Sequence, residues 1–132
     1  MNNVVLDTNI IVSAVISPNG NPAKILNMAL DKTIRINLSA KILAEYEEVL
    51  SRSEFNFSSE QQNTLMLGIK KSGLLLEPTV NDVPMSDEDD RIFYDTAKEN
   101  GATLITGNTK HYPVEPFIKT PSDFLASLDN GL

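Results

Sequence analysis

The chain has 132 residues, 41% of them hydrophobic and 22% charged, which predicts one globular domain (1–132) with its own core. It has no cysteine, no apolar run of transmembrane length and no signal-peptide pattern, so we expect no disulfide bond, no thiolate metal site, no membrane contact and a cytoplasmic location. The net charge of −7 disfavours a broad basic face for nucleic acid, but divalent cations can neutralise clustered carboxylates, so a nucleic-acid enzyme is not excluded.

Apolar strand-like runs alternate with helical patterns along the chain. In chain order we expect a strand at 4–6, helices at 10–16 and 22–30, a strand at 34–38, helices at 40–52 and from the capping-box pair Ser59 and Gln62 to about Gly73, a strand at 74–76, a loop at 81–87, a helix at 88–100, strands at 102–106 and 117–118, and a helix from Pro121. This alternation predicts βαβ units, and therefore an α/β fold with a mostly parallel sheet and helices on both faces.

Asp7 directly follows the first apolar run, and apolar residues resume after the triplet Asp7-Thr8-Asn9. In open α/β sheets ligands bind outside the carboxyl ends of the strands, so Asp7 lies where such folds carry their chemistry. The alternative is that Asp7 only caps the next helix, because Asp and Asn are favoured at that position. This run alone does not choose between the two interpretations.

Three glutamates lie on the helix predicted at 40–52. Glu45 and Glu47 fall on opposite borders of its apolar stripe, whereas Glu48 falls in the middle of the solvent face. Either border residue can lean over the sheet, and Glu48 is expected at the surface. The alternative, favoured for an isolated helix, is that all three are solvated charges.

Four consecutive acidic residues follow Ser86 and open the next helical pattern. One or two acids are expected there, because a helix N-terminus favours negative charge and Ser86 or Asp87 is a good cap. Four adjacent carboxylates repel one another, and a divalent cation would offset that repulsion. Asp89 and Asp90 both lie one turn before Phe93, and periodicity does not choose between them.

The triplet Thr106-Gly107-Asn108 ends the strand predicted at 102–106, at the same edge of the sheet as Asp7. Gly and Asn are turn residues, so a turn is expected, and it would also present Thr106 and Asn108 to the site. The acids and amides together predict an oxygen-lined pocket. Such hard ligands suit Mg²⁺ or Mn²⁺, ions that serve phosphodiester hydrolysis.

With these motifs in place, the sequence resembles the PIN domain (PilT N-terminus) family of metal-dependent ribonucleases. Within that family it is similar to the VapC-like branch of toxin components in bacterial and archaeal toxin–antitoxin systems. The resemblance covers nearly the whole chain. The matching runs are VLDTNI (5–10), LSAKILAEYEEVL (38–50), DEDDR (87–91), LITGN (104–108) and TPSDFL (120–125).

The resemblance implies three catalytic carboxylates that hold the metal. Asp7 matches the family's first aspartate, Glu45 its helix glutamate, and Asp90 its third acid, with Ala97 seven residues further on. Many members have a fourth acid after the Thr-Gly pair, where this chain has Asn108. An amide oxygen can bind a metal but brings no charge, which weakens a second metal site.

The supporting positions are also implied by the resemblance, whereas the basic residues and the histidine are assigned from their own chemistry and place in the chain. Asp87 or Asp89 would partly replace the charge missing at the fourth acid. Thr8, Asn9 and Thr106 match positions that support the metal ligands by hydrogen bonding. Lys110 and Arg91 are expected RNA contacts, although a solvated charge is the usual role of each, and the single histidine, His111, is expected to be structural or solvent-facing.

The resemblance implies a three-layer αβα sandwich, Mg²⁺ or Mn²⁺ as cofactor, and hydrolysis of RNA by water activated at the metal. It also implies a homodimer and a cognate antitoxin protein as partner. A phosphoaspartate enzyme of the haloacid-dehalogenase type is disfavoured, because it needs a second acid where this chain has Asn9. The alternative that stays open is a PIN-fold binding or scaffold module without activity, which Asn108 and the acidic net charge favour.

Overall fold

The described residues of the computed structural model, 2–77 and 88–130, form one five-stranded sheet in which every pairing is parallel. The strands are β1 (Asn3–Leu6), β2 (Arg35–Leu38), β3 (Leu74–Leu75), β4 (Thr103–Ile105) and β5 (Ile118–Lys119). The helices are α1 (Thr8–Ile16), α2 (Asn21–Leu30), α3 (Ala40–Leu50), α4 (Ser59–Ser72), α5 (Arg91–Asn100) and α6 (Pro121–Asn130), joined by 3₁₀ turns at Ser53–Phe55, Glu88–Asp90 and Thr109–His111. The predicted α/β class and parallel sheet are confirmed.

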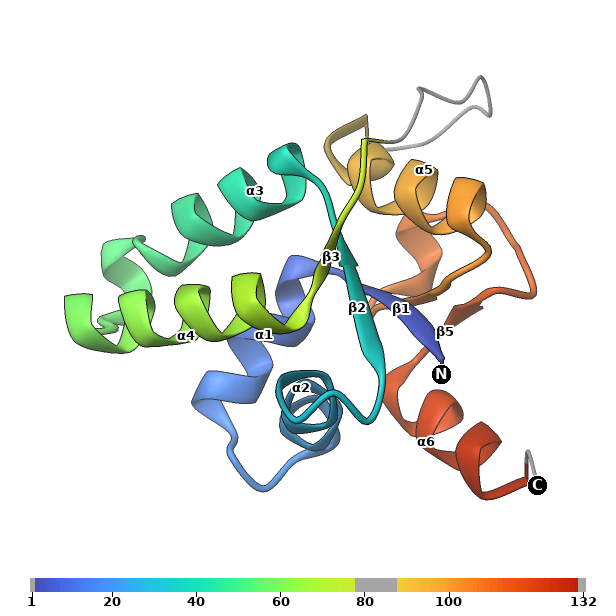
Figure 1. The fold of residues 1–132 in the computed structure, drawn as a ribbon, viewed down its shortest axis with the longest axis horizontal. Coiled ribbons are helices and arrows are strands. Elements are labelled where there is room, and N and C mark those ends of the chain that lie inside the picture. Colours follow the sequence, from blue (N-terminus) through green and yellow to red (C-terminus); the bar gives the residue numbers. More distant parts are fainter. Residues whose placement is uncertain (1, 78–87, 131–132) are drawn as a thin grey trace.

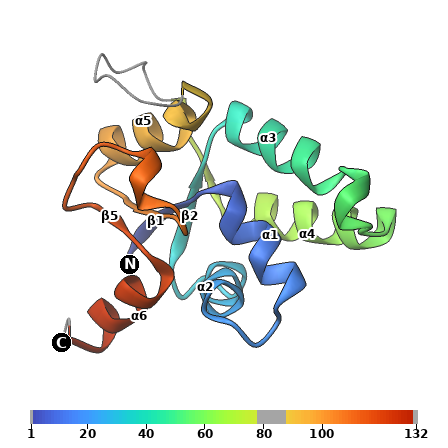
Figure 2. The same cartoon turned by 180° about the vertical axis from the view of Figure 1, so that it is seen from behind.

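Helices cover both faces of the sheet, which gives the predicted three layers (Figures 1 and 2). Helix α5 packs against β1, β2 and β4 on one side. On the other side α1 contacts β1 and α4 contacts β2, while α2 packs on α1, α4 and α6. Strands β1 and β2 are almost wholly buried between these layers, which explains their continuous apolar runs.

The strand order β3-β2-β1-β4-β5 places the topological switch point between β1 and β4. From β1 the chain moves outward to β2 and β3, and then returns to form β4 on the other side of β1. Ligands in open α/β sheets bind where the strand order reverses, beyond the carboxyl ends of the strands. Asp7 follows β1 and Thr106 follows β4, so both residues lie at this point.

Several predicted element ends were wrong by one or a few residues. The capping box at the start of α4 uses Ser58 and Gln61 instead of Ser59 and Gln62. Both pairs have the required spacing, and the helix begins at Ser59, which makes Ser58 the N-cap residue. Helix α1 begins two residues earlier than predicted, and the first turn of the helix predicted at 88–100 is a 3₁₀ turn. The loop predicted at 81–87, with Ser86 and Asp87, lies outside the described residues.

Two glycines are required by the backbone. Gly101 ends α5 with φ +64°, as expected for a helix C-terminus. Gly73 joins α4 to β3, where a Cβ atom would lie 2.3 Å from Cδ1 of Leu38 and 3.1 Å from the carbonyl oxygen of Ile36. This close approach lets α4 run directly into the edge strand.

Among the helices that the structure describes, none combines the length and apolar character needed to cross a bilayer.

Candidate functional site

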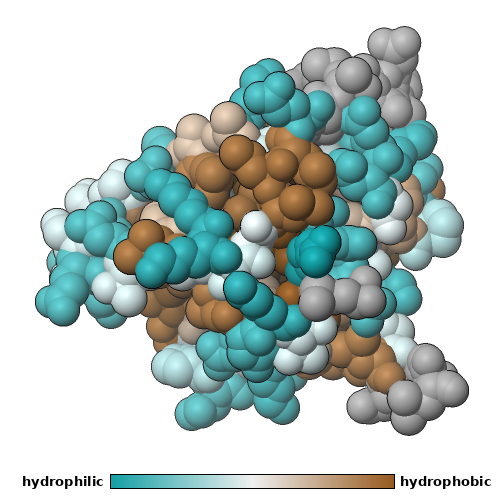
Figure 3. All heavy atoms as spheres, viewed as in Figure 1, coloured by the Kyte–Doolittle hydropathy of each residue, from teal (hydrophilic) through white to brown (hydrophobic). Residues whose placement is uncertain are grey.

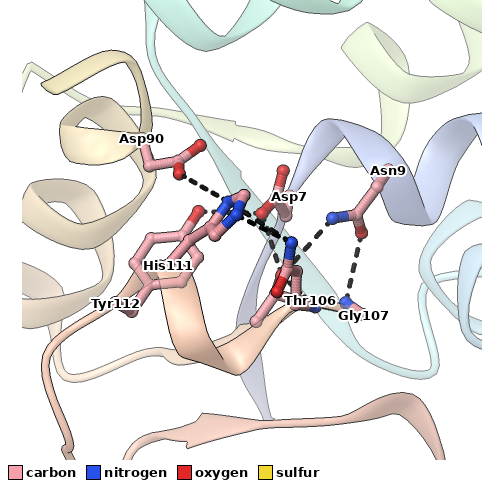
Figure 4. A network of polar contacts seen from close by, with 8 residues as sticks. Asp7, Asn9, Asp90, Thr106, Gly107, His111 and Tyr112 are labelled. Atoms are coloured by element: carbon pink, nitrogen blue, oxygen red, sulfur yellow. Dashed lines mark hydrogen bonds and ion pairs between the residues drawn. The ribbon is translucent and has the colours of Figure 1, made fainter. Parts of the chain in front are cut away.

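Asp7 is a buried carboxylate at the carboxyl end of the central strand. Its backbone N–H donates to the carbonyl of Ile105 over 3.0 Å and so ends the β1–β4 ladder, and its side chain is only 7% exposed. Asp7 occupies the N-cap position of α1 but makes no side-chain cap hydrogen bond. Its Oδ2 instead accepts hydrogen bonds from Thr106 Oγ1 (2.9 Å) and Tyr112 Oη (2.8 Å) (Figure 4). Asp7 is therefore not the simple helix cap that the sequence left as an alternative.

The turn after β4 is built around Thr106, which is fully buried. Its hydroxyl donates to Asp7 and accepts the backbone N–H of Asn108 at 3.0 Å. Asn9 spans the same turn, because its Oδ1 accepts the N–H of Gly107 at 3.2 Å and its Nδ2 lies 3.5 Å from Thr106 Oγ1. These bonds join the ends of β1 and β4 into one rigid corner beneath Asp7.

Helix α3 brings Glu45 to the same edge. The Thr8 hydroxyl donates to Glu45 Oε2 over 3.1 Å, which ties this half-buried glutamate to the residue after Asp7. Glu47 is exposed and lines a different hollow facing α4, and Glu48 is exposed and pairs with Arg52 at 2.9 Å. Of the two border residues that helical periodicity could not separate, the structure brings only Glu45 toward Asp7.

Asp7 and Glu45 open into one shallow cleft of about 310 Å³ between α1 and α3. Arg52 and Phe55 line the outer part of this cleft. The cleft therefore combines two carboxylates at its base with a cation and an aromatic ring at its rim. Residues 52–55 follow α3 directly, so the short 3₁₀ turn there positions the rim.

Asp90 approaches from the opposite side, at the start of α5. Its Oδ2 lies 3.5 Å from Nδ1 of His111, whose Nε2 lies 3.0 Å from Nδ2 of Asn108 (Figure 4). The same Asn108 nitrogen also lies 3.4 Å from Nδ1, so this amide contacts both ring nitrogens of His111. His111 was expected to be structural or solvent-facing, and it is half-exposed but links two predicted site residues. Asp89 is exposed beside this group.

Tyr112 is a site residue that the sequence reasoning missed. It is 6% exposed, and burial, followed by the negative charges of Asp7 and Asp90, raises the pKa of its hydroxyl. Burial and the charges of Asp7 and Glu45 likewise raise the pKa of Tyr46, whose hydroxyl donates to the Leu6 carbonyl at 2.5 Å. Both phenols stay protonated donors at neutral pH. Asp7 acts on both phenols, Glu45 acts on Tyr46 and Asp90 acts on Tyr112, so the negative charges of all three predicted catalytic acids reach this part of the structure.

The two predicted RNA contacts differ in their surroundings. Lys110 is exposed in the 3₁₀ turn between Asn108 and His111. Arg91 has a mostly buried side chain, and its Nη1 lies 3.5 Å from Oδ1 of Asp95 on the same helix. Lys110 is therefore the more accessible of the two cations.

The donor chemistry at this edge fits a hard divalent cation. Both hydroxyl donors converge on Oδ2 of Asp7, and the neighbouring ligands are carboxylate and amide oxygens, which such ions prefer. In the part of the chain that the structure describes, no three His, Cys, Asp or Glu side chains come close enough together to hold an ion. Any coordination by Asp7, Glu45 and Asp90 together would require their side chains to converge further. Asp87 lies outside the described residues.

The comparisons with known proteins agree with this geometry. The family model described as "PIN domain" matches residues 3–110. An uncharacterized protein of Methanocaldococcus jannaschii, MJ1680, is 33% identical over 108 residues, which cover 80% of this chain and 70% of that protein. The crystal structure of VapBC2 from Rickettsia felis bound to a promoter DNA fragment has a similar fold, with a TM-score of 0.59 and 20% identity over 89% of this chain and 96% of that one. The family match extends from β1 through the turn at Asn108, and thus includes every strand end that forms the site, so the chain belongs to the PIN domain family.

Proposed function

We propose that this protein is a metal-dependent ribonuclease and the toxin component of a toxin–antitoxin system. The observation that carries the proposal is the buried Asp7 carboxylate, held by two hydroxyl donors and opening with Glu45 into one cleft. A buried carboxylate with no helix-capping role calls for another function, and the switch point of a parallel sheet is where such folds bind ligands.

In this proposal Asp7, Glu45 and Asp90 hold a Mg²⁺ or Mn²⁺ ion, with Asn108 as a neutral oxygen ligand and Asp87 or Asp89 as further acids. When bound, such an ion polarises a phosphoryl oxygen and lowers the pKa of water. Thr106 and Tyr112 both donate to Oδ2 of Asp7, which leaves Oδ1 to face the ion. Thr8 orients Glu45 in the same way, through the bond to Oε2.

The remaining residues of the cleft suit an RNA strand. Arg52 lies at the rim and can contact a phosphate, while Phe55 beside it offers a ring on which a base can stack. Lys110 is exposed on the turn after β4 and is a second cation that can contact a phosphate. Arg91 contributes less, because it is turned toward Asp95.

The proposed antitoxin needs an apolar docking surface close to the site. A groove of about 450 Å³ lies among the helices on the α4 side of the sheet, lined by Val15, Leu30, Leu50, Phe57 and Leu65 together with polar residues of α4. Grooves with an apolar floor and polar borders take up the apolar face of a partner's helix. The VapBC2 structure contains a bound fragment of promoter DNA, and we extend to this chain only the expectation of a protein partner.

A second apolar surface supports the proposed homodimer. Leu74 and Leu75 on the edge strand β3 are exposed, the latter by 61%, and no other strand of the described residues pairs with the outer edge of β3. Figure 3 shows hydrophobic residues gathered over β3 between α3 and α5. Exposed apolar areas of this kind mark interaction sites, and an edge strand can pair with its own copy around a twofold axis.

The test compares the wild-type chain with Asp7→Asn, Glu45→Gln and Glu47→Gln. Cellular RNA would be incubated with Mg²⁺ or Mn²⁺, and the metal affinity of each protein measured by isothermal titration calorimetry. We expect Asp7→Asn and Glu45→Gln to abolish cleavage and weaken metal binding. Glu47→Gln is the matched control, because it makes the same change two residues away, on the side of α3 that faces α4 and away from Asp7, and it should leave both measurements unchanged.

The outcomes separate the nuclease from the binding-module alternative. Cleavage that depends on metal and on both Asp7 and Glu45 would support the nuclease. Metal binding without cleavage of any RNA would point to a binding or scaffold module that retains the site. An Asp7→Asn variant with wild-type activity would contradict the assignment of the site altogether.

A further inference from the structure

A basic cleft lies at the end of the sheet opposite to Asp7. It has a volume of about 290 Å³ and is formed where α2 leads into β2 and α4 leads into β3. Three cationic side chains line it, namely Lys32, Arg35 and Lys71, and the backbone at Gly73 forms part of its wall. Arg35 opens β2 and Leu38 ends it, so at about 3.3 Å per residue the cleft is separated from the catalytic edge by roughly 10 Å of strand or more.

These three cations stand out on a protein whose net charge is −7. The chain has 11 Lys and Arg residues in all, and three of them meet in this one hollow. Two cations outside the cleft are paired with acids, Arg52 with Glu48 and Arg91 with Asp95. Within residues 2–77 and 88–130, no carboxylate forms an ion pair with Lys32, Arg35 or Lys71.

Part of this charge has a structural explanation. Helices α2 and α4 both end at the cleft, and each helix C-terminus carries about half a negative charge, which favours nearby lysines. Asp31 adds one more negative charge beside Lys32. Three positive charges against about two negative ones leave a net positive charge at the cleft. The helix ends explain Lys71 and Lys32 more readily than Arg35.

Arg35 is the residue that the helix ends do not explain. It precedes three buried residues of β2, but its own side chain is exposed. Its backbone N–H donates a hydrogen bond to the carbonyl of Asn2. Its guanidinium can donate two parallel hydrogen bonds to one anionic group, and the two lysines add point charges from either side. A hollow of this size is too small for a large ligand but accepts a single tetrahedral anion.

We propose that this basic cleft binds a phosphate group, as a site separate from the catalytic cleft. The phosphate belongs either to the backbone of an RNA strand or to a free phosphate or mononucleotide. The RNA source rests on the proposed function, whereas the free-phosphate source does not. In the RNA case the cleft supplies electrostatic anchoring in addition to that of Arg52 and Lys110 at the acidic catalytic edge.

The test removes the three charges while keeping the side chains polar, as Lys32→Gln, Arg35→Gln and Lys71→Gln in one protein. A control protein carries Lys24→Gln, Lys41→Gln and Lys98→Gln, three exposed lysines outside the cleft, so its net charge is the same. Both sets are made in the Asp7→Asn background and measured in EDTA, so that neither cleavage nor metal at the catalytic edge contributes. Binding of a labelled single-stranded oligouridine is followed by fluorescence anisotropy over a salt series. Inorganic phosphate is titrated separately against the melting temperature.

If RNA is the source, the cleft variant should bind the oligouridine at least about tenfold more weakly, and its slope of log affinity against log salt should become shallower by about 0.7, since the cleft holds one phosphate and each neutralised phosphate contributes about 0.7. The control should match the parent protein. If free phosphate is the source, inorganic phosphate should raise the melting temperature of the parent and control but not of the cleft variant. Equal behaviour of all three proteins in both arms would overturn the proposal. Should the triple variant melt early without ligand, Arg35→Gln alone replaces it, with Lys24→Gln alone as its control, and the same direction of change is expected in each arm. Because no arm measures cleavage, failure of the nuclease proposal would leave the phosphate result interpretable.

Discussion

Replacing Tyr112 by Phe removes a single hydroxyl from the site and leaves the buried ring in place. That hydroxyl donates to Oδ2 of Asp7 at 2.8 Å, and Thr106 is the other donor to the same oxygen. A hydrogen bond to a charged group contributes about 1.5–3 kcal/mol, so the variant should lose about 2 kcal/mol of folding free energy. For 132 residues the unfolding entropy is about 0.28 kcal/mol/K, which converts this loss into a fall of about 7 °C in the melting temperature.

The same change should weaken metal binding, because Asp7 would be free to rotate away from the orientation that presents Oδ1. Loss of a residue that orients a ligand typically lowers metal affinity by about 10- to 100-fold. We expect at least a tenfold rise in the dissociation constant for Mn²⁺, measured by calorimetry on the folded variant well below its melting temperature. Cleavage should fall mainly through metal occupancy, so saturating Mn²⁺ should restore much of the rate.

Tyr94→Phe is the matched control. Tyr94 is also a buried tyrosine, but its hydroxyl lies 3.4 Å from Lys98 Nζ and contacts no carboxylate in the described residues. This variant should change neither the affinity for Mn²⁺ nor the dependence of cleavage on the Mn²⁺ concentration. A Tyr112→Phe protein that melts early but binds Mn²⁺ as tightly as the wild type would refute the positioning role and leave a purely structural one.

Two further predictions concern the whole domain. Above about pH 10 a tyrosine in the unfolded chain loses its proton, whereas the raised pKa values of Tyr46 and Tyr112 keep these phenols protonated in the native state. The native state then binds more protons than the unfolded state, so the free energy of unfolding falls as the pH rises. Chemical denaturation should show a loss approaching about 2.7 kcal/mol per pH unit, and Tyr46→Phe should remove about half of it; a profile unaffected by that change would contradict the argument. On the edge strand, Leu75→Lys should convert a dimer into monomers in analytical ultracentrifugation, and a dimer that persists would place the interface elsewhere.

The ends of the strands were predictable because each apolar run stops at a polar residue, and parallel strands bring such ends together. Asp7 and Thr106 could thus be placed at one edge before the structure was considered. Glu45 could not be separated from Glu47 by periodicity, since both border the apolar stripe of α3. In the structure Glu47 lies on the side of α3 that faces α4, whereas Glu45 lies on the side that faces Asp7.

Tyr112 could not be predicted for a different reason. It lies in an irregular segment after a 3₁₀ turn, where neither the helical nor the strand period applies. An aromatic residue there is normally assigned to the core, and only the three-dimensional path of residues 108–112 turns its hydroxyl toward Asp7. The shifted capping box at Ser58 has a simpler cause, since two adjacent serines each have a glutamine three residues later.

The two bonds to Asp7 join residues 99 and 105 positions apart in the chain. During synthesis the carboxylate therefore emerges from the ribosome long before either of its donors. Contacts this distant in sequence form late, after most of the loop-closure entropy has been overcome. A growing chain that has not yet reached Tyr112 lacks the completed corner, so the proposed catalytic edge can assemble only after this residue has been made. Under the proposed function, this order of assembly withholds the activity of a new chain until both donors to Asp7 are present.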